Sequence, residues 1–153
     1  MIRSDKRLRL CRCLMAAILC FIWGNSMLPA NSSLSLSEWV RMVLTDSIPI
    51  RAGEINWASV FVRKLAHFVE FGALGVCMAW HHGMLEKKQL RGFAACVLAA
   101  CIDESIQFFS PGRAPGLYDV IIDSMGAGCG MLLLIFGHTY LKKRSTQKQL
   151  EDK

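Results

Sequence analysis

Several motifs that mark common enzyme and metal-binding classes are absent from this sequence. It has no Cys-x-x-Cys pair, and Cys11-x-Cys13 alone does not define a metal site. No Gly-x-Ser-x-Gly motif indicates a nucleophilic serine, and neither an internal repeat nor a low-complexity segment is present. The seven cysteines lie within or beside apolar runs, which is typical of small apolar side chains and argues against a disulfide framework.

Charged residues are scarce and unevenly placed. They make up 20% of the 153 residues, whereas hydrophobic residues make up 53%, and apolar runs alternate with short basic segments. This pattern predicts a membrane protein rather than a soluble core. The net charge of +6 does not indicate nucleic-acid binding, because Lys and Arg cluster at the ends of the apolar runs.

Four apolar runs are long enough to cross a bilayer as helices, which takes roughly 20 residues each. They cover residues 8–28, 57–80, 90–109 and 117–137. The sequence therefore predicts an all-α fold, a polytopic membrane helical bundle with about four transmembrane helices. A cleaved signal peptide is the alternative for the first run, because that run follows a basic segment.

The basic residues predict the orientation of the chain in the membrane. Most of the 18 Lys and Arg residues lie within residues 3–12, 87–91 and 142–153. The positive-inside rule assigns these segments to the cytoplasm. We therefore expect a multi-pass protein in contact with the lipid bilayer, with both termini cytoplasmic.

Residues 29–56 form the first outer connection. Ser35-x-x-Glu38 has the form of a capping box, and apolar residues then recur at helical spacing. This predicts a short amphipathic helix on the membrane surface or over the bundle. The expected parts of the chain are the basic amino end with the first helix (1–28), the outer loop (29–56), the transmembrane core (57–137) and the basic cytoplasmic tail (138–153).

Ionisable residues lie inside these apolar runs, although each ionised group costs about 2.5–3.5 kcal/mol to insert. The predicted topology brings those of the last three runs to one depth in the outer half of the bundle. Many are three or four residues apart, so they share a helix face. Asp103 and Glu104 are adjacent and diverge by about 100°, so we expect one to face the centre and the other a neighbouring helix or loop. The candidate binding residues are Lys64, His67, Glu70, Asp103, Glu104, Gln107, Arg113, Asp119 and Asp123.

The connection from Ser110 to Gly116 contains two Pro-Gly turn signals and holds Arg113 over the carboxylates. Arg113 is expected to pair with an acid or to bind a phosphate of a lipid head group. The acids suit proton exchange or a buried hydrogen-bonded network, and a divalent metal with oxygen ligands is a further alternative. No metal site or other cofactor is assigned, because one His-x-x-Glu pair is a weak signal.

Small residues mark a site of close helix packing. Gly126 and Gly130 are four residues apart, a small-xxx-small pattern that lets another helix approach. Packing within the bundle is the preferred interpretation, and homodimerisation is the alternative. The oligomeric state does not follow from the sequence.

Three motifs, in this order, resemble the VanZ-like family of small bacterial membrane proteins. They are Arg63-Lys-Leu-Ala-His67-Phe-x-Glu70-Phe71, Asp103-Glu104-x-x-Gln107-x-Phe109-x-Pro111-Gly-Arg113 and Asp119-Val-x-x-Asp123-x-x-Gly126-x-x-x-Gly130. The resemblance covers about residues 57–137, with Phe71 standing where the family often has Tyr. It implies a place in the bacterial cytoplasmic (inner) membrane and a role at the cell envelope. The family's namesake is associated with low-level resistance to teicoplanin, a glycopeptide antibiotic that binds cell-wall precursors outside the membrane.

These features favour an integral membrane protein of the cell envelope whose outward-facing polar site binds a lipid-linked or phosphate-bearing ligand. Whether the chain is an enzyme is left open. One alternative is a membrane-embedded enzyme acting on a lipid head group, with His67, Glu70 and Glu104 as candidate catalytic residues. Another is a small proton-coupled transporter, in which buried carboxylates relay protons.

Overall fold

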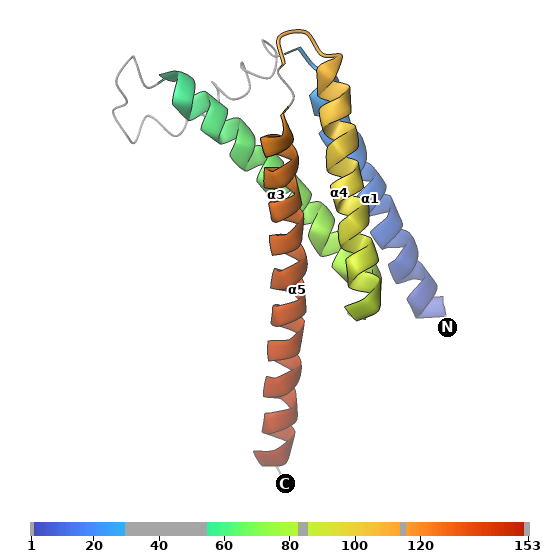
Figure 1. Ribbon diagram of the computed structural model, residues 1–153. Helices are drawn as coiled ribbons and strands as arrows, with labels where there is room; N and C mark the ends of the chain where they lie inside the picture. The colour runs from blue at the N-terminus through green and yellow to red at the C-terminus, as the bar shows by residue number, and fades with distance from the viewer. Residues whose placement is uncertain (1, 30–54, 83–85, 114–115, 152–153) are drawn as a thin grey trace.

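Helices account for most of the residues that the structure places. The computed structural model describes residues 2–29, 55–82, 86–113 and 116–151 (Figure 1). These residues form α1 (Ile2–Met27), α3 (Ile55–His82), α4 (Glu86–Phe108) and α5 (Leu117–Glu151), and they contain no strand. The all-α prediction is confirmed, while the amphipathic helix expected after Ser35 lies outside the described residues.

The connection between α4 and α5 follows the turn signals of the sequence. After α4 ends at Phe108, Gly112 adopts a φ of 75°, a left-handed conformation that favours glycine. The carbonyl oxygen of Gly116 then accepts a hydrogen bond of 2.9 Å from the backbone amide of Asp119, and this bond closes the first turn of α5. At its other end α5 continues past the expected limit at residue 137, so the basic tail is helical through Glu151.

Two helices are long and apolar enough to cross a membrane by composition alone. These segments are Lys6–Met27 in α1 and Leu117–Leu150 in α5. Glu70 in α3 and Asp103 in α4 are among the ionisable residues that lower the hydropathy of the other two helices. The two apolar helices support the prediction that this is a membrane protein. Length and hydropathy do not confirm the prediction of four membrane spans.

The four described helices pack as a bundle around a small apolar core. Figure 1 shows α1 and α4 side by side, with α3 and α5 crossing beside them. The largest helix contact joins α3 and α5, and the carboxyl-terminal part of α5 extends beyond the other helices. The core includes Ile22, Phe71, Leu74 and Cys96, all fully buried. All seven cysteines are free, and the burial of Cys96 agrees with its interpretation as a small apolar residue.

Glycines bring the backbones of α3 and α5 into contact. A Cβ atom added to Gly126 would lie closer than 3.0 Å to the carbonyl oxygen of Phe68, and one at Gly130 would crowd the backbone of α3 in the same way. On α3, Gly75 faces the backbone of Ala127 equally closely. A side chain at these positions would push the helices apart. The pattern of Gly126 and Gly130 therefore serves packing within the chain, as predicted.

We predict that Gly126→Ala lowers the free energy of unfolding by more than about 2 kcal/mol, because the new methyl group collides with the backbone of α3. Thermal unfolding of the purified protein in detergent measures this loss. Gly137→Ala is the matched control, because a Cβ atom at Gly137 meets nothing within 4 Å. Equal melting temperatures for the two variants would contradict the backbone contact.

Candidate functional site

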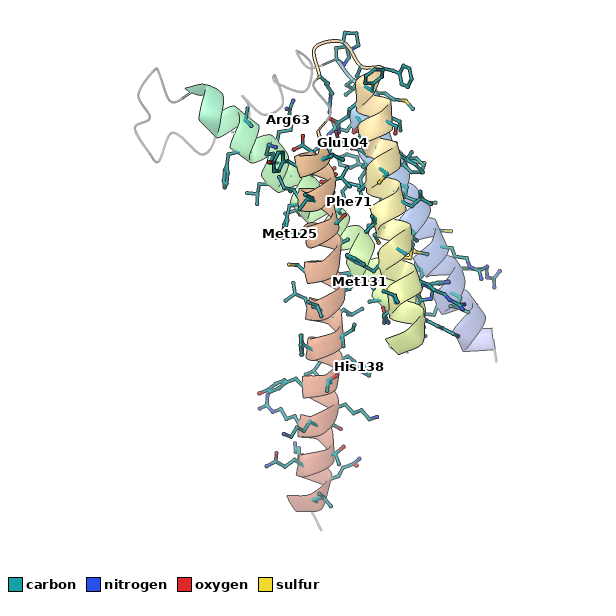
Figure 2. The ribbon with its side chains drawn as sticks, viewed as in Figure 1. Arg63, Phe71, Glu104, Met125, Met131 and His138 are labelled. Atoms are coloured by element: carbon teal, nitrogen blue, oxygen red, sulfur yellow. The ribbon has the colours of Figure 1, made fainter. Side chains whose placement is uncertain are left out.

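Polar side chains gather at the end of the bundle that carries the connection between α4 and α5. Arg63 and Glu104 both lie toward this end in Figure 2. The buried polar and charged residues among those described are Ser26, His67, Asp103, Glu104, Gln107, Ser110 and Asp123. They come from α1, α3, α4, α5 and the connection, so segments far apart in the sequence contribute to one polar region.

A small cavity lies between α3, α4 and α5 in this region. Its volume of about 20 Å³ is enough for about one water molecule or a small ion. Six of the nine candidate residues line it: Lys64, His67, Glu104, Gln107, Asp119 and Asp123. Arg63 and Ile122 complete the lining. Asp103 lies beside His67, whereas Glu70 and Arg113 are not part of the cavity wall.

His67 on α3 lies near two carboxylates that come from other helices. Its Nδ1 atom is 3.7 Å from Oδ2 of Asp103 on α4 and 3.8 Å from Oδ1 of Asp123 on α5. The side chain of His67 is 11% exposed, and those of Asp103 and Asp123 are 0% and 1% exposed. These distances are too long for direct hydrogen bonds, so the three groups surround a small shared space.

Asp103 and Gln107 lie one turn apart on α4. Nε2 of Gln107 donates a hydrogen bond of 2.7 Å to Oδ2 of Asp103, so the two side chains share a face, as their spacing predicts. Other buried oxygens lack a hydrogen-bond partner among the described residues: Oδ1 of Asp103, both carboxylate oxygens of Asp123, Oε1 of Glu104 and Oε2 of Glu70. A buried oxygen without a donor is costly, so these atoms are the part of the site best able to bind a further group.

Two acids hold the amino end of α5. Oε2 of Glu104 accepts a hydrogen bond from the amide of Gly116 at 2.9 Å, and Asp119 forms an ion pair with Nζ of Lys64 on α3. Negative charge at this position is favoured by the unpaired amides of the first helical turn and by the helix dipole. Glu104 thus faces the connection while Asp103 faces the centre, as expected for adjacent residues on a helix.

Arg113 forms no ion pair with an acid among the described residues, which corrects one of the two expectations for it. Its Nη2 donates to the carbonyl oxygen of Asn25 at 2.8 Å, and its Nε donates to that of Leu28 at 3.1 Å. Beside it, Oγ of Ser110 donates to the carbonyl oxygen of Ser26 at 2.7 Å. These bonds tie the connection to the carbonyls of the last turn of α1 and of Leu28, the residue after it. Partial burial lowers the pKa of Arg113 from its usual range, although a guanidinium stays protonated at neutral pH.

Two features of the site differ from the candidate set. The carboxyl end of α1 belongs to the polar region, and the only sequence signal for this is that Asn25 and Ser26 interrupt the first apolar run. Glu70 is expected in the site, but it does not line the cavity, and its buried Oε2 has no hydrogen-bond partner within the described residues.

An apolar groove of about 480 Å³ adjoins the cavity where α4 meets α5. Its walls are formed by Glu104, Ser105, Phe108, Phe109, Gly116, Leu117 and Val120. Glu104 lines both spaces, so the polar cavity and the apolar groove meet at this side chain. Ser105 is not activated as a nucleophile, because its exposed hydroxyl donates to the carbonyl oxygen of Cys101 at 2.8 Å.

We expect Arg113→Gln to lower the free energy of unfolding by about 2 kcal/mol, because two charge-assisted hydrogen bonds to α1 are lost. Unfolding in detergent measures the change, and hydrogen exchange is expected to rise at the carboxyl end of α1. Arg91→Gln is the control, since Arg91 is exposed near the other end of α4. A loss no larger than that of the control would show that Arg113 does not hold the connection in place.

Comparison with known proteins identifies a family. A family model described as VanZ/LLP1 matches residues 12–138. The match begins in α1, well before the motifs of the last three apolar runs, and it ends in α5. No curated protein and no solved structure matches the chain. Together with the two apolar helices, the family match indicates a membrane protein. The chain therefore belongs to the VanZ/LLP1 family.

Proposed function

We propose that this chain is a multi-pass protein of the bacterial cytoplasmic membrane, in which all four described helices lie in the bilayer. The distribution of apolar surface supports this. Phe61, Leu65 and Val69 form an exposed apolar stripe on α3, and Leu98 and Ile102 form another on α4. A soluble protein rarely exposes such continuous apolar surface, whereas lipid tails cover it readily. His67 on α3 and Asp103 and Glu104 on α4, which lie within these apolar segments, are buried inside the bundle, where they do not meet lipid.

The basic segments support an orientation with both termini in the cytoplasm. In Figure 1 the amino ends of α1 and α4, the carboxyl end of α3 and the far part of α5 all point to one side of the bundle. Arg9, Arg12, Lys88, Arg91 and Lys142 belong to these parts of the helices. The polar cavity lies toward the opposite end. The positive-inside rule therefore favours an outward-facing site.

We also propose that this site binds a lipid-linked or phosphate-bearing ligand. The observation that carries it is the junction, at Glu104, of a polar cavity that contains Arg63 with an apolar groove. Arg63 lines the cavity without an ion pair or hydrogen bond to the other described residues, whereas Lys64 is paired with Asp119. A guanidinium binds phosphate through two parallel hydrogen bonds. Because the cavity is too small for a whole head group, the phosphate would bind at its mouth beside Arg63.

The groove suits the hydrocarbon part of such a ligand. Phe108, Phe109 and Leu117 are each more than 70% exposed, so they are available to an apolar chain that approaches from the lipid. A ligand with a phosphate and a long apolar chain would satisfy both parts of the site. The family's association with glycopeptide resistance agrees with this class of ligand, since teicoplanin binds cell-wall precursors outside the membrane.

A membrane-embedded enzyme acting on a lipid head group is the second candidate function. It is favoured by one observation, the convergence of His67, Asp103 and Asp123 within a buried space next to Glu104. Such groups move protons and stabilise developing charge in many enzymes. Binding is ranked first because no serine, threonine or cysteine side chain lines the cavity among the described residues.

Reporter fusions are expected to give the predicted orientation. A green fluorescent protein joined to the carboxyl terminus should fluoresce, because that end is cytoplasmic. Alkaline phosphatase joined after Phe109 should be active, because its disulfides form only outside the cytoplasm. Active phosphatase at the carboxyl terminus would overturn the orientation.

We expect Arg63→Gln to reduce co-purifying anionic or polyprenyl lipid at least tenfold, because a guanidinium that lines the cavity is removed. Mass spectrometry of the protein purified from native membranes measures the bound lipid. Arg91→Gln serves as the matched control, since Arg91 is exposed near the other end of the bundle. Equal enrichment of the same lipid species in both variants would argue against binding at Arg63.

A further inference from the structure

His67, Asp103 and Asp123 are three buried ionisable residues that lie close together in the described part of the chain. One ligand atom from each residue lies within 4.8 Å of the other two, and each residue comes from a different helix. The two Nδ1–oxygen distances are 3.7 and 3.8 Å. This arrangement is compact enough for all three side chains to contact one small ion at the same time.

The charge balance of the trio is unusual. Asp103 and Asp123 are completely or almost completely buried, and three of their four oxygens have no hydrogen-bond partner among the described residues. Two buried carboxylates this close together need a compensating positive charge or a proton. His67 alone supplies at most one charge, and its Nδ1 is too far from either acid for a hydrogen bond.

The nearby cations are directed elsewhere. Lys64 is paired with Asp119 at the amino end of α5, and Arg113 donates to the carbonyl oxygens of Asn25 and Leu28 at the end of α1. Arg63 lines the cavity but forms no ion pair with Asp103 or Asp123. Arg113 also has a buried Nη1 without a hydrogen-bond partner, but it forms no ion pair with either acid. Among the described residues, no lysine or arginine is therefore paired with Asp103 or Asp123.

We propose that His67, Asp103 and Asp123 bind one divalent metal ion. An imidazole nitrogen with two carboxylates is a donor set suited to Zn²⁺ or Mn²⁺. Ligands of a tetrahedral Zn²⁺ site lie about 3.4 Å apart, given metal–ligand distances of roughly 2.0–2.1 Å. The two separations from Nδ1 of His67, 3.7 and 3.8 Å, are only a few tenths of an ångström longer, and the two carboxylates lie within 4.8 Å of each other.

Two neighbouring features complete such a site. The adjoining cavity of about 20 Å³, lined by His67 and Asp123, has room for a water molecule as a further ligand. Gln107 donates to Oδ2 of Asp103 and so orients that carboxylate, as partners of metal ligands commonly do. The metal site does not depend on the proposed lipid ligand, because its residues are supplied entirely by this chain.

Metal binding by the full-length protein in detergent tests the proposal. The purified chain is stripped with EDTA, dialysed and titrated with MnCl₂, because the free cysteines would compete for Zn²⁺. We expect one Mn²⁺ per chain, and a melting temperature about 5 °C higher at a hundredfold excess over Kd. Less than a tenth of an ion per chain, with no change in melting temperature, would overturn the proposal.

Variants assign the ion to these residues. Asp123→Asn and His67→Gln are expected to weaken Mn²⁺ binding at least tenfold. His138→Gln is the matched control, because it removes an imidazole from an exposed position far along α5 (Figure 2). Unchanged affinity in Asp123→Asn or His67→Gln would place the ion elsewhere and overturn the assignment.

A measurement on the unmodified chain covers the case in which the variants do not fold. Pulsed electron paramagnetic resonance of the Mn²⁺-loaded protein is expected to detect a coordinated imidazole nitrogen. Absence of a nitrogen coupling would overturn the site, because His67 is one of its three ligands. None of these measurements includes lipid, so failure of the metal site is distinct from failure of the proposed lipid binding.

Discussion

The close contact between the backbones of α3 and α5 determines where the polar site lies. Gly126 meets the carbonyl of Phe68, the residue that follows His67, and Asp123 lies one turn before Gly126 on the same helix. Because no side chain separates the helices there, the imidazole of His67 and the carboxylate of Asp123 come within 3.8 Å. Wider helix spacing would separate these groups and let water or lipid enter between them. The glycines and the buried acids are therefore two parts of one arrangement, although only the acids carry chemistry.

α4 and the connection after it complete the site from the other side. Asp103 lies near His67, while the side chain of the next residue, Glu104, accepts a hydrogen bond from the backbone amide of Gly116. The amino end of α5 is thus held by a carboxylate from α4 and by the ion pair of Asp119 with α3. Arg113 then ties the connection to the end of α1. Each contact uses an unpaired backbone group or an opposite charge, so the polar residues stabilise the helix ends as well as forming a site.

Part of this could be predicted from the sequence because helical spacing is a strong constraint. The four-residue separation of Asp103 and Gln107 predicts a shared face, and their hydrogen bond confirms it. The hydrogen bonds of Arg113 to the end of α1 could not be predicted, because nothing in residues 110–116 indicates that α1 ends beside them. Glu70 illustrates a second limit. Its spacing from His67 predicts a shared face, but three residues along a helix also change the depth by about 4.5 Å, so it falls outside the cavity.

The remaining question is what balances the negative charge at the centre of an apolar bundle. A surface ion pair contributes little, but an unpaired carboxylate away from water is strongly unfavourable, so its presence points to a bound partner or a retained proton. Near His67, Asp103 and Asp123, Lys64 and Arg113 bind groups at the ends of α5 and α1. We therefore divide the site into two zones. Arg63 lies at the outer zone, where an anion can approach, while Asp103 and Asp123 form an inner zone that suits a cation. A phosphate and a divalent ion are attracted to each other, so occupancy of the inner zone would strengthen binding at the outer one. The two zones are consistent with a single site in which metal and anionic ligand bind next to each other.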